Sequence, residues 1–266
     1  MAPKYLVSNK VLQPFSHSLI DKAPKGPVFV WLHGWGQDKR SLMRLAGLFE
    51  KQATHYIFDL PGFGQTNKLA DGAGTKDYAD ALAETLIHLK ISTPIIFIGH
   101  SFGGRVAVQM AAHYPTMTKA IVLLAGAGLK RSRSFSFILR ANYLKLLSKI
   151  SKISDKLFKT TFYKTYSQKY GSADYKAAGD LRPTFVRVVN EDLSEEAKTI
   201  HCETLLIYAD QDTAAPPEIG KKYATLIPTA YYHELTGYGH LDMLDRGAYQ
   251  CKALMDDFFV KLNADD

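Results

Sequence analysis

Long apolar runs and cysteines are both scarce in this chain, and their scarcity excludes several classes of protein. No stretch approaches the roughly 20 apolar residues of a membrane helix, so we expect no integral membrane span. The first residues lack the apolar core of a signal peptide. With only Cys202 and Cys251, a disulfide scaffold is excluded, and both are expected to be free thiols in a reducing compartment. These features predict a cytoplasmic protein.

Metal-binding patterns and repeats are also missing. The two cysteines have no ligand histidines near them, and no cluster of His, Cys, Asp and Glu has metal-ligand spacing. There is no internal repeat or low-complexity tract. What remains is a chain of 266 residues, 46% hydrophobic and 22% charged, which is ordinary for a soluble globular protein. The sequence therefore predicts a folded core without a metal site.

Short apolar runs alternate with helical patterns along most of the chain. The runs cover residues 28–32, 56–58, 95–98, 120–125 and 204–208, and a last short strand is expected at 230–235. Helical patterns lie near 40–51, 76–90, 103–114, 217–226 and 245–262, and an N-terminal hairpin is expected within 4–20. Unbroken apolar runs are typical of strands buried on both faces. The alternation predicts an α/β fold, with a mostly parallel sheet and helices on both of its faces.

This alternation breaks between residues 129 and 198, where helical patterns follow one another without strands. Apolar residues recur there at spacings that place them on one face of a helix, namely Leu139, Tyr143, Leu146, Ile150, Ile153 and Leu157. We interpret 129–198 as a helical cap inserted into a core formed by 1–128 and 199–266. The apolar face is expected to pack over the nucleophile identified below.

The basic charge is concentrated in the same insertion. Residues 130–169 carry a net charge of +10, which leaves −3 for the rest of a chain whose total is +7. The basic residues are Lys130, Arg131, Arg133, Arg140, Lys145, Lys149, Lys152, Lys156, Lys159, Lys164 and Lys169. They indicate either a solvated helix face or attraction of an acidic carrier protein, an anionic substrate or an anionic surface. Nucleic acid is not expected, because the segment has no aromatic-interleaved basic platform or known binding motif.

A candidate nucleophile follows the strand at 95–98. Gly99-His100-Ser101-Phe102-Gly103 fits G-x-S-x-G between a predicted strand and a predicted helix, the context that this motif requires. Ser101 is expected on a strained turn, and the strand and helix are expected to pass too closely for side chains at 99 and 103. The alternative is a glycine-rich turn with an incidental serine.

Two backbone amides are candidates for an oxyanion hole. The sequence His33-Gly34-Trp35-Gly36 follows the first long strand, and Phe102 follows Ser101. Acyl transfer needs two such donors aimed at the developing oxyanion, which predicts the amides of Trp35 and Phe102. A plain turn is the alternative for the Trp35 loop.

A serine nucleophile needs a histidine base and an acid that orients it. His240 lies in a glycine-rich loop after the last strand, whereas His233 lies within that strand and is expected to pack. Asp212 follows the strand at 204–208 by a short turn and is preferred to Asp210, which is closer to the strand end. The chain order Ser101, Asp212, His240 is the order that the G-x-S-x-G fold requires.

Taken together, the motifs resemble those of the α/β-hydrolase family. They are 33–36, Asp59-Leu60-Pro61-Gly62-Phe63-Gly64, 99–104, Asp212 and Gly239-His240, in the family's order. The resemblance implies an eight-stranded, mostly parallel sheet with a cap after the sixth strand, and a serine hydrolase without metal or organic cofactor. It implies a structural role for Asp59, as a turn residue that bonds backbone. Serine at 101 argues against haloalkane dehalogenases and epoxide hydrolases, which use aspartate there.

Within the family, the motifs at 33–36 and 59–64 look like those of pimeloyl–carrier-protein methyl esterases and of general carboxylesterases. A histidine precedes Ser101, where the best-known esterase of that kind has a tryptophan. We therefore expect a carboxylic ester hydrolase that acts on a small-molecule ester through an acyl-enzyme. Two alternatives share the motifs: a carbon–carbon bond hydrolase, and a slow-turnover ligand receptor or signalling hydrolase.

Overall fold

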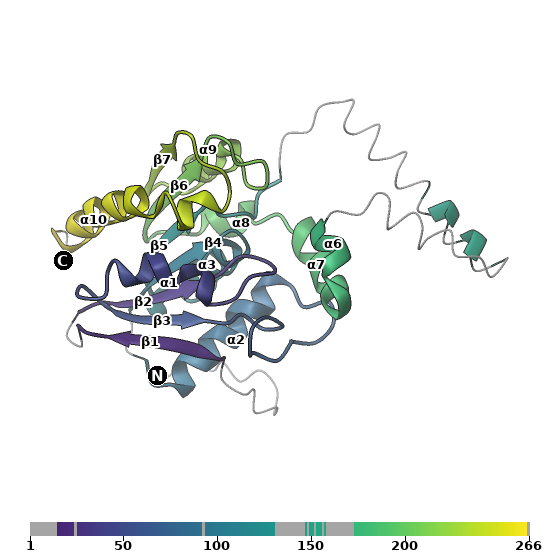
Figure 1. Ribbon diagram of the computed structural model, residues 1–266, viewed down its shortest axis with the longest axis horizontal. Helices are drawn as coiled ribbons and strands as arrows, with labels where there is room; N and C mark the ends of the chain where they lie inside the picture. The colour runs from purple at the N-terminus through teal and green to yellow at the C-terminus, as the bar shows by residue number, and fades with distance from the viewer. Residues whose placement is uncertain are drawn as a thin grey trace.

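In a computed structural model, residues 15–23, 26–91, 94–130 and 173–264 are described, together with isolated positions between 147 and 157. A seven-stranded sheet in the order β1-β3-β2-β4-β5-β6-β7 forms the centre of this part of the chain (Figure 1). Its strands are β1 (His17–Asp21), β2 (Val28–Leu32), β3 (Thr54–Phe58), β4 (Ile95–His100), β5 (Thr118–Leu124), β6 (Glu203–Ala209) and β7 (Ala230–Leu235). Neighbouring strands are parallel except for β1, which pairs with β3 in the antiparallel direction.

Helices cover the sheet in two layers. On one side, α1 (Arg40–Gly47) packs against α10 (Ala248–Ala264). In the other layer, α2 (Thr75–His88) packs on α3 (Phe102–His113), and α9 (Pro217–Leu226) covers β6 and β7. All six residues of β4 are buried, which explains why the central strands are continuous apolar runs rather than alternating patterns. Three 3-10 turns complete the elements: η1 (Pro115–Met117), η2 (Gly179–Leu181) and η3 (Asp242–Leu244).

The predicted alternation of strands and helices is confirmed, with boundaries that differ by a few residues. The expected eighth strand is not confirmed, because the described residues form seven. Of the hairpin expected within 4–20, the structure describes only the part that contains β1, and residues 1–14 lie outside the described ranges. The helical insertion follows the fifth strand of the described residues, β5.

Between β5 and β6 the described residues are helical. They form α6 (Ala173–Ala177), η2, α7 (Arg182–Asn190) and α8 (Ser194–Lys198). The end of α7 is tied to the start of α2, because the Thr75 hydroxyl donates a 2.6 Å hydrogen bond to Glu191. In contrast, α8 packs on α3 and α9 and buries Ala197 completely. This last helix of the predicted cap thus rests on the core.

The long cap helix that the sequence predicts lies mostly outside the described residues, including Leu139, Tyr143 and Leu146. Three of its apolar positions are described, and Ile150, Ile153 and Leu157 are 53%, 58% and 68% exposed. The expectation that this face packs over the nucleophile is wrong at these positions, because side chains so exposed have no such packing. In the ranges that the structure covers, no helix has the length and apolarity needed to cross a bilayer.

Candidate active site

Ser101 lies at the junction of β4 and α3, in a backbone conformation that non-glycine residues rarely adopt. Its φ and ψ are 49° and −105°. A Cβ added at Gly99 would lie 2.4 Å from the carbonyl oxygen of Gly103, and one at Gly103 would lie 2.0 Å from that of Leu32. The predicted close approach of strand and helix is confirmed. Strain of this kind, about 1–3 kcal/mol, persists only where the surroundings enforce it, and it is common at functional sites.

His240 and Asp212 meet at the carboxyl end of the sheet. The distance from Nδ1 of His240 to Oδ2 of Asp212 is 2.6 Å, and Asp212 is 3% exposed. The same carboxylate accepts hydrogen bonds from the amides of Ala214, at 2.7 Å, and Ala215, at 2.9 Å. Burial alone would raise the pKa of Asp212, but the bonds from His240 and the two amides outweigh burial and lower it. Asp212 is therefore ionised and oriented toward the imidazole.

Asp210, the alternative acid, does not contact His240 and instead stabilises a turn. Its carboxylate accepts a 2.8 Å hydrogen bond from the Gly237 amide, and its side chain is exposed. This bond holds the turn after β7. The geometry thus pairs His240 with Asp212, as the sequence favours.

His100 connects the histidine loop to the nucleophile turn. Its ring centroid lies 4.7 Å from that of His240, and its Nε2 lies 3.2 Å from the His240 carbonyl oxygen. Burial, together with the nearby His240, lowers the pKa of His100 to about 3. His100 therefore stays neutral at ordinary pH, and its low pKa makes it a poor proton acceptor for the Ser101 hydroxyl. Because it directly precedes Ser101, it places the His240 loop beside the nucleophile.

Other histidines have structural contacts. His33 is buried, its Nε2 accepts the Leu60 amide at 2.9 Å, and its Nδ1 donates to the Gly34 carbonyl at 2.8 Å. Desolvation holds the pKa of His33 below its usual value. The expectation that His233 packs is wrong, since it lies exposed on β7, the outermost strand on its side of the described sheet.

Asp59 has the structural role that the family resemblance implies. Its carboxylate accepts the amides of Lys39, at 2.8 Å, and Gln65, at 3.0 Å. The Lys39 ammonium lies 2.9 Å away. These bonds join the loop after β3 to the start of α1.

Trp35 and Phe102, whose amides are the predicted oxyanion donors, both line a cavity, and their side chains are in contact. The ring of Trp35 contacts those of Phe102, Phe63 and Phe185, with centroids 5.3, 5.0 and 5.1 Å apart. Within the described part of the chain, no residue accepts a hydrogen bond from the backbone amide of Trp35 or Phe102. Both amides are thus available for a substrate oxygen.

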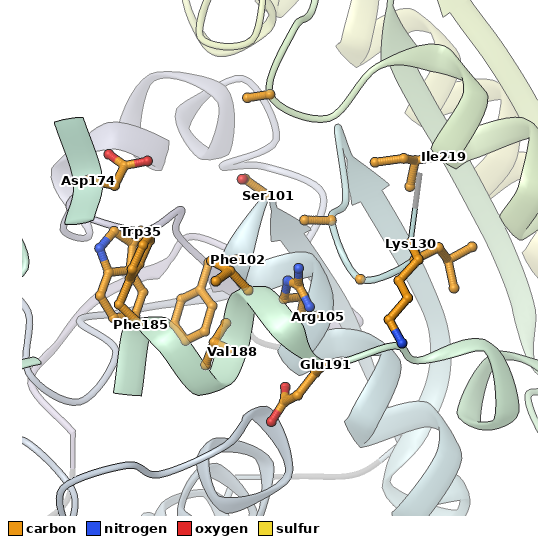
Figure 2. A pocket seen from close by; sticks show the side chains of 15 residues that line it. Trp35, Ser101, Phe102, Arg105, Lys130, Asp174, Phe185, Val188, Glu191 and Ile219 are labelled. Carbon is orange, nitrogen blue, oxygen red and sulfur yellow. The ribbon is translucent and has the colours of Figure 1, made fainter. Parts of the chain in front are cut away.

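The cavity opens beside Ser101 and has a volume of about 260 Å³ (Figure 2). Its walls come from the turns after β2, β4, β5 and β6 and from α3, α6, α7 and α9. The lining residues are Trp35, Ser101, Phe102, Arg105, Ala127, Gly128, Leu129, Lys130, Asp174, Phe185, Val188, Val189, Glu191, Ala214 and Ile219. Among the described residues, no group of three or more His, Cys, Asp or Glu side chains could hold a metal ion.

Sequence reasoning missed most residues of this wall, and two of them, Arg105 and Phe185, bear on its chemistry. Arg105 follows Ser101 by four residues on α3, and this spacing could have revealed a shared helix face. Phe185 carries no comparable signal, because only the folding of α7 against the Trp35 turn brings it to the site.

Comparison with known proteins assigns the family. Residues 29–249 match the alpha/beta hydrolase family, and the chain belongs to it. The hydrolase YugF of Bacillus subtilis is 28% identical over 236 residues, which cover 82% of this chain and 85% of that protein. The pimeloyl-[acyl-carrier protein] methyl ester esterase of Shewanella oneidensis is 34% identical over 108 residues, covering 41% of this chain and only 38% of the esterase. A thermophilic esterase from Thermogutta terrifontis superposes with a TM-score of 0.66 at 19% identity, covering 92% of this chain and 93% of the other.

Proposed function

We propose that the protein is a serine hydrolase that cleaves carboxylic esters through an acyl-enzyme. Ser101 is the nucleophile, His240 the general base and acid, and Asp212 the residue that orients His240. The amides of Trp35 and Phe102 form the oxyanion hole. No metal or organic cofactor takes part.

The reaction proceeds in two half-reactions. The Ser101 oxygen bonds to the ester carbonyl carbon while Nε2 of His240 takes the hydroxyl proton. The two amides stabilise the tetrahedral oxyanion. When this intermediate collapses, the bond to the alcohol oxygen breaks and His240 returns the proton to the alcohol. Water then attacks the acyl-enzyme with the same histidine as base, releasing the carboxylic acid and free Ser101.

The observation that carries this proposal is the 2.6 Å bond from His240 to a buried Asp212. The same carboxylate accepts the amide of Ala214, which lines the cavity together with Ser101. A buried carboxylate at Nδ1 fixes the tautomer whose Nε2 can accept a proton. The strained turn at Ser101 supports the same interpretation. Relatives named hydrolase and methyl ester esterase agree with ester cleavage.

We further propose that residues 129–198 act as a cap over the site and that their basic segment attracts an acidic partner. The name of the Shewanella esterase specifies a substrate on an acyl-carrier protein, which makes such a carrier the first partner to test. A cytoplasmic location is part of this proposal, since both cysteines are free.

A fluorophosphonate probe tests the nucleophile, because it reacts with activated serines. The wild type is expected to gain one adduct, which peptide mass spectrometry locates on Ser101, and Ser101→Ala is expected to gain none. A panel of p-nitrophenyl esters from acetate to dodecanoate tests the chemistry, and Ser101→Ala should lower kcat by roughly 10⁴–10⁶. Labelling at another residue, or unchanged activity in Ser101→Ala, would end the proposal. Labelling of Ser101 without fast turnover of any ester would favour the receptor alternative.

A further inference from the structure

Arg105 is a charged residue in the cavity wall that the proposed reaction does not use. It lies on α3 one helical turn after Ser101, and its side chain lies between Phe102 and Lys130 on the wall (Figure 2). Ser101 is the N-cap of this helix, and both residues line the same cavity. A group bound by Arg105 would therefore lie within a few bonds of a carbonyl carbon at Ser101.

The guanidinium of Arg105 has no partner in the described part of the chain. Its Nη1 is buried and makes no hydrogen bond. Desolvation lowers the pKa of Arg105, because no acceptor replaces the water that burial removes. Burying a charged donor without an acceptor costs free energy. A ligand that supplies the acceptor removes this cost and therefore binds more tightly.

The carboxylates nearest to Arg105 are engaged elsewhere. Glu191 accepts hydrogen bonds from the amide and the hydroxyl of Thr75. Asp192 accepts a 2.6 Å bond from the Ser194 hydroxyl and lies 3.7 Å from the Lys130 ammonium. Tyr223, Glu191 and Asp192 raise the pKa of Arg105 through charge interactions, but neither carboxylate forms an ion pair with it. A ligand bound in the cavity that Arg105 lines would supply the acceptor that these carboxylates do not.

We propose that Arg105 is a specificity-determining residue that binds a carboxylate carried by the acyl or the alcohol part of the ester, so that short esters with a free carboxylate are preferred substrates. This inference rests on the proposed function and names its substrate class. A guanidinium matches a carboxylate through two parallel N–H donors, and such charge-assisted bonds are about twice as strong as neutral ones. Lys130 also lines this cavity, but its ammonium lies 3.7 Å from the Asp192 carboxylate, so its charge is already paired.

A residue of the protein itself is an alternative acceptor for Arg105. Gln109, a further turn along α3, has a buried Oε1 without a hydrogen-bond partner, while its Nε2 donates to the Thr75 hydroxyl at 3.1 Å. A rotated Arg105 could donate to that oxygen and would then be structural. In that case Arg105→Gln and Gln109→Leu would both lower the melting temperature, and neither would change substrate selectivity.

The test compares charged and neutral esters of matched length. Monomethyl glutarate carries the carboxylate on the acyl side, 4-acetoxybutyrate carries it on the alcohol side, and methyl pentanoate and butyl acetate are the neutral counterparts. In Arg105→Gln, kcat/KM for at least one charged ester should fall tenfold or more, about 1.4 kcal/mol, mainly through KM. The neutral esters should stay within about threefold. In Arg105→Lys, kcat/KM for the charged esters should lie between the values of the wild type and Arg105→Gln. Lysine keeps the positive charge but cannot donate two parallel hydrogen bonds to one carboxylate.

Lys198→Gln is the matched control, since it removes one positive charge from an exposed ion pair with Glu195 on α8 and should leave all ratios unchanged. Equal losses for charged and neutral esters in Arg105→Gln would overturn the inference. A lower melting temperature of Arg105→Gln with an unchanged ratio of kcat/KM between charged and neutral esters would also overturn it.

A binding measurement separates this inference from the proposed function. Calorimetry with monomethyl glutarate and 4-acetoxybutyrate on Ser101→Ala needs no turnover, and adding Arg105→Gln should weaken binding of at least one of them tenfold or more. If the wild type cleaves no ester but this binding difference is found, the proposed function fails and the carboxylate site stands. If esters are cleaved and Arg105→Gln changes neither binding nor selectivity, only the carboxylate site fails.

Discussion

His240 and Asp212 are 28 positions apart in the chain, yet Nδ1 of the imidazole lies 2.6 Å from Oδ2 of the carboxylate. The two loops that carry them follow adjacent parallel strands, β6 and β7, so both end at the same edge of the sheet. Because Asp212 also accepts two backbone amides, its orientation is independent of the imidazole. The histidine is thus positioned by a carboxylate that is itself fixed.

Replacing the acid separates the two aspartates. Asp212→Asn removes the charge that fixes the tautomer and should lower kcat by roughly 10²–10⁴. Asp210→Asn is the matched control, because it changes only the turn held by the Gly237 amide and should cost less than about threefold. Steady-state kinetics with p-nitrophenyl butyrate checks both variants. If the two phenotypes were exchanged, the assignment of the acid would be wrong.

Packing at the nucleophile turn predicts a large difference between two glycines. In Gly103→Ala the new methyl group would meet the backbone oxygen of Leu32 at 2.0 Å, so strand or helix must move. We expect a loss of about 2 kcal/mol or more in the free energy of unfolding, with loss of activity. Gly47→Ala, at the end of α1, meets nothing within 4 Å and should be neutral or stabilising by up to about 1 kcal/mol. Urea unfolding measures both, and equal effects would contradict the close approach.

Buried histidines predict a loss of stability in mild acid. The pKa of His100 is lowered to about 3 in the folded protein, by burial first and by His240 second. In the unfolded chain the pKa of this imidazole is about 6.5. Between about pH 3 and pH 6.5 the unfolded state therefore binds a proton at His100 that the folded state does not bind. The free energy of unfolding should therefore fall as the pH drops below about 6.5. Buried His33 and His55, whose pKa values are also lowered, act in the same direction.

Urea unfolding at pH 7.5 and pH 5.0 measures this effect. His100→Gln should lose less stability between the two pH values than the wild type, since one of the contributing groups is gone. The exposed His233 supplies the control, and His233→Gln should keep the wild-type difference. An unchanged difference in His100→Gln would show that His100 is protonated in the folded state.

The basic segment predicts a salt-dependent effect on acidic partners alone. Changing Lys145, Lys149 and Lys152 to glutamate should leave kcat/KM for a neutral short ester within about threefold. For an ester carried by an acidic acyl-carrier protein, the same change should reduce kcat/KM tenfold or more, about 1.4 kcal/mol. This loss should shrink at higher salt, because exposed charges are screened over about 8–10 Å. If no acidic substrate responds, the segment is a solvated face and the esterase proposal is unaffected.

Much of the fold and the core of the candidate site could be predicted from the sequence. The strand runs were visible because central strands of a parallel sheet are buried on both faces and therefore uniformly apolar, as β4 is. Ser101 was visible because the tight turn admits only glycine at 99 and 103, which leaves a local pattern. His240 and Asp212 followed from chain order, because loops after neighbouring parallel strands converge on one edge.

Only the tertiary structure decided which side chains share an environment. It placed His233 in solvent on the outermost described strand of its side, whereas its position within the last predicted strand suggested packing. It showed Ile150, Ile153 and Leu157 exposed, although their helical spacing suggested a buried face. It brought Phe185 of α7 onto Trp35 and left Arg105 without a partner in the cavity wall. Periodicity and motifs indicate which residues of one helix or strand share a face. Whether a side chain is buried, or a charge is paired, depends on residues from other helices and strands, and no local pattern encodes those contacts.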